Sequence, residues 1–265
     1  MGTFLECPGD ESNLSRSVAW SAARRIVTAA APPRRYWWRN GVAVPALFAI
    51  AAIVCKLSGF DDALAARVFD PASQQFLARE SALVELLGHR LAKSAVFACW
   101  LALLAAALAS SWIPQLRAQR KLLWVTALAM ASGPLLVVVL KPLNAVHCPW
   151  DLKQFGGIAD PASGWFVAAA DARRCFPSGH AAGGFSFVAL SFAGAVAGRP
   201  RLQRAGLVLA LSAGFAFSAV RILQGAHFAS HNLWSAAIDW AAAALVFALF
   251  FAATSRRRAP QPGAT

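Results

Sequence analysis

The stretch that decides the fold runs from residue 122 to residue 140 and reads LLWVTALAMASGPLLVVVL. It contains no ionisable side chain and is followed directly by Lys141. A helix needs about 20 mostly apolar residues to cross the ~30 Å hydrocarbon core of a bilayer. The stretch therefore predicts a transmembrane helix with a charged residue at one end.

Five further stretches have the same character, which predicts an all-α polytopic membrane protein with a six-helix transmembrane bundle at 41–253. The six predicted spans are 41–57, 94–113, 122–140, 181–198, 204–222 and 233–253. Composition agrees, because 58% of the 265 residues are hydrophobic and only 14% are charged, more apolar surface than a soluble domain of this length can bury. Gly and Ala in the fourth span predict close helix packing. Asp239, inside the sixth span, is expected to make a packing hydrogen bond.

The net charge of +13 lies in short clusters between the apolar runs, as membrane topology signals do, so no nucleic-acid partner is expected. One set of segments holds 15 of the 25 Lys and Arg residues and only three of the 12 acids; it comprises the tails 1–40 and 254–265 and the turns 114–121 and 199–204. By the positive-inside rule these segments are cytoplasmic. The loops 58–93, 141–180 and 223–232 then face the periplasmic side of the inner membrane.

The first outer loop contains two amphipathic stretches, around 61–69 and 80–92. They are predicted to form short helices along the membrane interface. The alternative is a solvated loop of mixed charge.

Polar residues gather at the predicted outer ends of spans that are far apart in the sequence. They are Lys141, Ser178, Gly179, His180, Arg221, His227 and His231. Ionisable residues at this depth are costly unless they are paired or functional. Two cations and a helix N-terminus suit a phosphate group, and histidine titrates in the range needed for a nucleophile or an acid. The sequence therefore predicts a site that binds and cleaves a phosphate ester.

The order and spacing of these residues resemble the type 2 phosphatidic acid phosphatase superfamily, the membrane lipid phosphatases related to vanadium haloperoxidases. Its signature is Lys, six residues, Arg-Pro; then Pro-Ser-Gly-His; then Ser-Arg, five residues, His, three residues, Asp. This chain supplies Lys141 with Cys148-Pro149, an intact Pro-Ser-Gly-His at 177–180, and Val220-Arg221 with His227 and His231. The resemblance covers roughly 94–253.

The resemblance implies that His227 is the nucleophile and forms a transient phosphohistidine. It implies that His180 protonates the departing lipid oxygen and then activates water. The phosphate-binding residues that it implies are Lys141, Ser178, Gly179 and Arg221. It implies no metal and no cofactor.

Two departures from the signature affect the site. Cys148 stands where an Arg normally binds phosphate, and Arg174 or Arg173, just upstream of the second motif, is the candidate replacement. His231 stands where an Asp normally orients the nucleophile. A neutral His231 can accept a hydrogen bond from His227 as a third catalytic residue.

Two carboxylates of the 141–180 loop, Asp151 and Asp171, are the alternatives to His231 for orienting the nucleophile. In the third motif, Val220 replaces the usual Ser, a smaller loss.

The five cysteines form no CxxC pair, so no zinc site is expected. Cys148 and Cys175 both fall in the 141–180 loop. In an oxidising compartment they are candidates for a disulfide that holds this loop over the site, and two free thiols are the alternative.

The favoured function is a phosphohydrolase that acts on a lipid phosphate or diphosphate while the chains of the lipid stay in the bilayer. By resemblance the candidate substrates are undecaprenyl diphosphate, phosphatidylglycerol phosphate, phosphatidic acid and the phosphates of lipid A. A lipid phosphotransferase would use the same phosphohistidine. A non-catalytic lipid-binding or transport protein on this scaffold is the third hypothesis, supported by the missing Arg and Asp.

Overall fold

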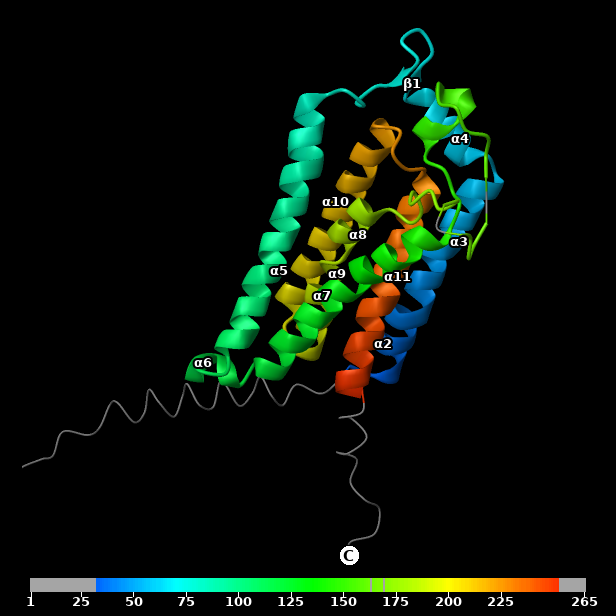
Figure 1. The fold of residues 1–265 in the computed structure, drawn as a ribbon. Helices are drawn as coiled ribbons and strands as arrows, with labels where there is room; N and C mark the ends of the chain where they lie inside the picture. Colours follow the sequence, from blue (N-terminus) through cyan, green and yellow to red (C-terminus); the bar gives the residue numbers. More distant parts are fainter. Residues whose placement is uncertain (1–31, 163, 169, 253–265) are drawn as a thin grey trace, which may run out of the picture.

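The computed structural model describes residues 32–162, 164–168 and 170–252. Of the predicted cytoplasmic tails, residues 1–31 and 254–265 lie outside this part of the chain. Six helices are long and apolar enough to cross a membrane, which confirms the predicted all-α membrane fold. They run side by side through most of the height of the structure (Figure 1). Their bounds are Arg34–Leu57, Val84–Ala109, Arg120–Leu143, Gly179–Val196, Pro200–Leu223 and Ala229–Phe251.

Several of the spans are built from consecutive helical segments. The first three spans comprise α2 (Arg34–Trp38), η1 (Arg39–Ala43) and α3 (Val44–Leu57); η2 (Val84–Leu91) and α5 (Ala92–Ala109); and α7 (Arg120–Leu140) and η3 (Lys141–Leu143). The last three comprise α8 (Gly179–Phe185) and α9 (Val188–Val196); α10 (Pro200–Leu223); and α11 (Ala229–Phe247) and η6 (Ala248–Ala252). The short α6 (Pro114–Arg117) joins the second and third spans.

The first outer loop differs in part from the prediction. The stretch 61–69 forms a separate helix, α4 (Phe60–Arg67), followed by the hairpin strands β1 (Phe69–Asp70) and β2 (Gln75–Phe76). The stretch 80–92 is helical too, but the prediction of a separate interfacial helix there was wrong. It continues into α5, so the second span begins at Val84, ten residues before the predicted start. No Pro interrupts residues 84–93, and extending an existing helix is easier than nucleating a second one.

The last span lies at the centre of the packing. α11 contacts α3, α7, α8 and α9, and the main apolar core lies between α7, α9, α10 and α11. The predicted close approach of the fourth span is confirmed where α8 crosses α10. A Cβ on Gly184 would lie 2.7 Å from backbone atoms of Gly214, so only glycine fits there.

The segments that connect the spans lie at the two ends of the bundle. The described part of the chain begins and ends at the end that carries α6, whereas α4, β1 and the 141–178 segment lie at the opposite end (Figure 1). The 141–178 segment includes the short helices η4 (Pro149–Asp151) and η5 (Lys153–Phe155). Both termini of the described chain therefore lie on the side away from the predicted site.

Asp239 is buried in the bundle against Gly133. A Cβ on Gly133 would lie 1.9 Å from Asp239 Oδ1 and 2.7 Å from its Cα. Neither carboxylate oxygen has a hydrogen-bond partner among the described residues, so the packing hydrogen bond expected from the sequence is not found. The absence of a side chain at residue 133 is what lets α7 and α11 approach each other here.

Replacing Gly133 with Ala is expected to destabilise the bundle, because backbone atoms of α11 must move away from α7. Overpacking of this kind typically costs about 1–3 kcal/mol. The measurement is thermal unfolding of the purified protein in detergent. Gly41→Ala is the matched control, since its new Cβ would lie an ordinary 3.7 Å from Ala244 Cβ. Equal melting temperatures for the two variants would contradict the prediction.

Candidate active site

A cavity of about 570 Å³ lies between α5, α7, α8 and α10. Polar residues line part of its wall: Lys141, Gly179, His180, Arg221 and His227. The rest of the wall is mainly apolar and includes Val96, Phe97, Trp100, Met130, Leu135, Val138 and Phe217. Five of the site residues predicted from the sequence therefore line one cavity.

The cavity has a side that faces the surface of the bundle. Phe97 of α5 is 57% exposed, and Leu135 and Val138 of α7 are 60% and 62% exposed. All three line the cavity as well. The cavity therefore opens sideways between α5 and α7, toward the region that lipid chains occupy around a membrane bundle.

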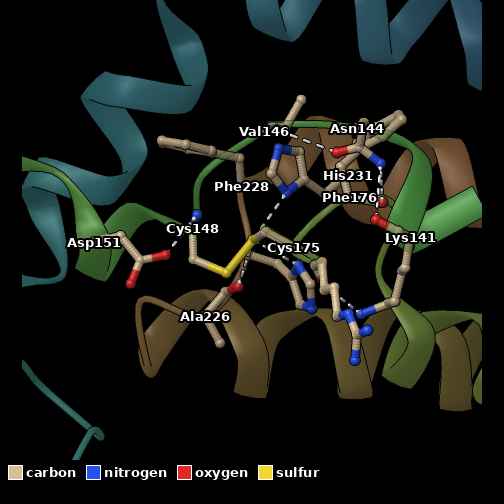
Figure 2. The surroundings of a disulfide bond; sticks show 12 residues. Lys141, Asn144, Val146, Cys148, Asp151, Cys175, Phe176, Ala226, Phe228 and His231 are labelled. Atoms are coloured by element: carbon tan, nitrogen blue, oxygen red, sulfur yellow. Dashed lines mark hydrogen bonds between the residues drawn. A yellow bond between two sulfur atoms is a disulfide. The ribbon is translucent and has the colours of Figure 1, made fainter. Parts of the chain in front are cut away.

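Lys141 is positioned by the chain that precedes the fourth span. Its Nζ donates to the carbonyl of Arg174 at 3.2 Å. A Cβ on Gly179 would lie 3.4 Å from Cε and 3.8 Å from Nζ of Lys141, so the ammonium group passes close over this glycine. The buried Asn144 joins the same segments, because its Nδ2 donates to the carbonyls of Lys141 and Phe176 (Figure 2).

Arg221 is held at the end of α10 by a chain of polar contacts. Its Nη1 donates to Gln224 Oε1 at 2.8 Å, and Gln224 Nε2 donates to Glu85 of η2 at 3.4 Å. The guanidinium lies 5.7 Å from the centre of the Trp150 ring, within the range of a cation–π contact. Its Nε is buried without a partner in the described chain. Arg221 also lines the cavity, so its guanidinium group is near enough to interact with an anion bound there.

His180 lies between the fifth span and the start of the second. Its ring stacks on Phe217 with centroids 4.8 Å apart. Its Nε2 lies 2.6 Å from the carbonyl oxygen of Gly88, so this nitrogen carries the proton in the observed arrangement. This proton is donated to a backbone carbonyl, so the implied acid role requires the imidazolium form, which carries a second proton on Nδ1.

His227 is 5% exposed and follows the turn after α10. Its Nδ1 lies 3.6 Å from Cys175 Sγ. The predicted disulfide between Cys148 and Cys175 is present, with Cα atoms 5.3 Å apart. The disulfide, rather than an acidic side chain, is therefore the neighbour of the His227 Nδ1.

His231 lies behind the disulfide and does not line the 570 Å³ cavity. Its Nδ1 lies 3.8 Å from Cys175 Sγ. Figure 2 shows the imidazole of His231 beside the disulfide. The His227 and His231 ring centroids are 5.8 Å apart, and each Nδ1 has the sulfur as its polar neighbour. The predicted hydrogen bond between the two imidazoles is therefore absent from the described residues. His231 instead lines a second, mainly apolar cavity of about 280 Å³ beside Lys56 and Trp234.

Ser178 is fully buried and caps the fourth span. Its Oγ accepts from the Ala181 N–H, as an N-cap side chain does, and its own N–H donates to the His231 carbonyl. Gly179, not Ser178, lines the cavity. Ser178 thus holds the start of the span in place.

Three further sequence hypotheses are not supported by the positions found. The side chain of Arg174 is exposed and does not line the cavity, so only its backbone carbonyl contacts a site residue, Lys141. Asp151 Oδ2 accepts from the N–H of Cys148 and caps η4, and Asp171 is exposed. The segment 171–175 is irregular and turns the Cys175 sulfur, rather than a charged side chain, toward the histidines.

Two residues that support the site were missed from the sequence. Asp61 of α4 is 1% exposed, and its carboxylate accepts from the N–H and the hydroxyl of Ser230 at the start of α11. It thereby anchors the segment between His227 and His231. Asn144 is the other. An acid in the first turn of an amphipathic helix and an amide three residues after Lys141 were the available signals, but both residue types are common in loops.

The neutral state of His227 follows from its surroundings. Burial lowers the pKa of His227 well below the usual 6.5, and the charges of His231, Lys141, Arg221 and His180 lower it further. The uncharged imidazole, which is the form that carries a free lone pair, therefore persists at mildly acidic pH.

We expect the acid limb of the kcat/KM profile to lie well below pH 6.5, because His227 loses its lone pair only when it is protonated at its lowered pKa. Phosphate release across the acidic range measures this limb. The ionisation of the substrate, determined separately by titration, is the control. A limb centred at or above the usual value of histidine would contradict the prediction.

Six apolar helices with cations and histidines on one cavity define a polytopic membrane protein equipped to bind an anion. The family model of the PAP2 superfamily matches residues 121–255, just over half of the chain. The chain belongs to this superfamily, and it is a membrane phosphatase in general terms. No curated protein and no solved structure matches it.

Proposed function

We propose that the protein is a phosphohydrolase that removes phosphate from a lipid phosphate or diphosphate at the periplasmic face of the inner membrane, through a phosphohistidine on His227. The observation that carries the proposal is the two-part wall of the 570 Å³ cavity. Its cations and histidines suit a phosphate group, and its apolar wall opens sideways between α5 and α7. A lipid can then present its head group while its chains stay among the helices and the bilayer.

The proposed reaction has two steps. His227 Nδ1 is turned to the Cys175 sulfur, which leaves Nε2 for attack on phosphorus. A P–N bond forms as the P–O bond to the lipid breaks, and His180, acting in its imidazolium form, gives a proton to the departing oxygen and becomes neutral. His180 then takes a proton from water, and the water oxygen displaces His227. Phosphate is released and both histidines return to their starting states.

Lys141 and Arg221 are proposed to neutralise the charge on the phosphate in both steps. Their half-buried position strengthens the attraction because less water screens it than at the surface. The forked guanidinium of Arg221, which lines the cavity, allows two parallel hydrogen bonds to the phosphate. Gly179 leaves room for Lys141 beside the phosphate.

The test is inorganic phosphate release by the purified protein in detergent, from the four candidate lipid substrates and from glycerol 3-phosphate. Each buried methylene contributes about 0.8 kcal/mol, so phosphatidic acid is expected to exceed glycerol 3-phosphate by at least ~100-fold in kcat/KM. Equal values would contradict a lipid substrate. Transfer of phosphate to another lipid, detected by mass spectrometry, would favour the phosphotransferase, and no release from any substrate would favour the non-catalytic protein.

The proposed side of the membrane is tested with sealed vesicles of both orientations and a substrate that cannot cross the bilayer. Hydrolysis is expected where the 141–180 loop faces the added substrate, and proteolysis of that loop reports the orientation. Hydrolysis only in inverted vesicles, which expose the cytoplasmic face to the added substrate, would contradict a periplasmic active site.

A further inference from the structure

Two cysteines and two histidines meet behind the active-site cavity. Cys148 and Cys175 come from the 141–178 segment, and His227 and His231 flank the start of α11. Cys175 Sγ lies 3.6 Å from His227 Nδ1 and 3.8 Å from His231 Nδ1. The ligand atoms of Cys148, Cys175 and His227 all lie within 4.8 Å of one another. None of the four residues is more than 8% exposed.

The distances from Cys175 Sγ to the two imidazole nitrogens match those between ligands of a tetrahedral zinc site. With Zn–S bonds of about 2.3 Å and Zn–N bonds of about 2.0–2.1 Å, a sulfur and a nitrogen ligand lie about 3.6 Å apart. His227 and His231 are separated by three residues, a spacing that zinc sites use. The sequence argued against zinc because no CxxC pair is present, but here each cysteine is brought in from a different part of one loop.

We propose that Cys148, Cys175, His227 and His231 form a redox-gated zinc site, which is closed while the disulfide is intact and binds Zn²⁺ once the disulfide is reduced. A dithiol reductant attacks the sulfur of Cys148, which is 8% exposed against 1% for Cys175. Two electrons pass to the protein, the S–S bond opens, and the reductant leaves as its own disulfide. Zn²⁺ then displaces the two thiol protons.

The surroundings favour the bound state. Two thiolates cancel the charge of Zn²⁺, so the buried complex with two neutral imidazoles has no net charge.

Zinc bound in this way would switch off the phosphatase without entering its cavity. Coordination through Nδ1 places the proton of His227 on Nε2, and the lone pair that attacks phosphorus is lost. This consequence rests on the proposed function, whereas zinc binding itself does not.

The experiment uses the full chain in detergent with Cys7, Cys55 and Cys99 replaced by Ser, so that only the two site cysteines remain. The protein is reduced with a phosphine, which takes its oxygen from water, and the phosphine is removed under argon. Co²⁺ is then titrated as a spectroscopic probe. We expect one Co²⁺ per chain, tetrahedral d–d bands and sulfur-to-cobalt charge-transfer absorption in the reduced protein only, with displacement by Zn²⁺.

Matched variants separate the site from adventitious binding. Cys148→Ser with Cys175→Ser should remove the charge-transfer absorption, and His231→Ala should weaken Co²⁺ binding at least ~10-fold. His147→Ala, next to Cys148, should leave binding unchanged. Binding that persists in the double serine variant, or a disulfide that resists reduction in the folded protein, would overturn the proposal. Zinc should lower phosphate release in reduced protein alone; cobalt binding without any phosphatase activity would overturn the proposed function and leave the metal site standing.

Discussion

Replacing His227 with Ala is expected to lower kcat/KM for the preferred lipid phosphate by about 10⁵-fold or more, since removal of a nucleophile leaves only binding and electrostatic contributions. His227 lines the cavity with the cations and lies against the disulfide. The assay is phosphate release by the purified variant. Of the other two histidines at the site, His180 donates its Nε2 proton to the Gly88 carbonyl and His231 lies outside the cavity, so neither is placed to attack phosphorus instead of His227.

The control for this variant is His147→Ala, which removes an imidazole from the 141–178 segment outside the cavity. His147→Ala is expected to keep wild-type activity. It should melt at the same temperature as His227→Ala, which would show that the activity lost in His227→Ala is not due to unfolding. Rapid acid quenching should also trap a phosphoenzyme in the wild type and none in His227→Ala. Substantial activity in His227→Ala, or a phosphoenzyme formed without this residue, would contradict the mechanism.

Replacing Arg221 with Ala is expected to lower kcat/KM by about 10³-fold, because a donor aimed at developing phosphate charge in a water-poor site is removed. Arg221→Lys keeps the charge but loses the two-pronged geometry, so a loss of roughly 10–100-fold is expected. Kinetics with one lipid phosphate measure both values. A larger effect of the lysine variant than of the alanine variant would contradict this reasoning.

Two other arginines test whether the effect is specific to Arg221. Arg79 lies 4.4 Å from the centre of the same Trp150 ring but does not line the cavity, so Arg79→Ala should retain activity. Arg174→Ala should lose far less than Arg221→Ala, since the side chain of Arg174 is exposed. An equal loss in Arg174→Ala would restore the sequence hypothesis that this residue binds phosphate.

The membrane fold was predictable because a 30 Å apolar slab requires long apolar runs, and these are visible one segment at a time. The first span begins at Arg34 rather than at residue 41, and the largest boundary error is at the start of the second span, where the charged residues Glu85 and Arg90 hide the continuation of the helix. Those two side chains pair with each other at 3.6 Å in η2, so polarity alone did not mark the boundary of the span.

The cavity was predictable where a motif joins a residue type to a helix end, as for Lys141, Gly179 and Arg221. The neighbours of His227 were not. His231 and Asp151 have suitable chemistry and spacing to orient His227. The path of the irregular 171–175 segment decides which group faces His227, however, and that group is the Cys175 sulfur. Asp61 acts on Ser230 across 169 positions of sequence, a contact that depends on tertiary packing alone.

The loop between the first two spans has a consequence for protein engineering. Residues 58–93, which comprise this loop and the start of the second span, precede the matched region 121–255. The Asp61 carboxylate, the Glu85 side chain and the Gly88 carbonyl in this segment nevertheless contact residues of the proposed active site or their supports. A chimera that joins only the last four spans to the N-terminal part of another protein would contain every motif residue. It would lack the contacts from residues 58–93 that orient these motif residues. Exchange of specificity between homologues should therefore transplant residues 58–93 together with the later helices.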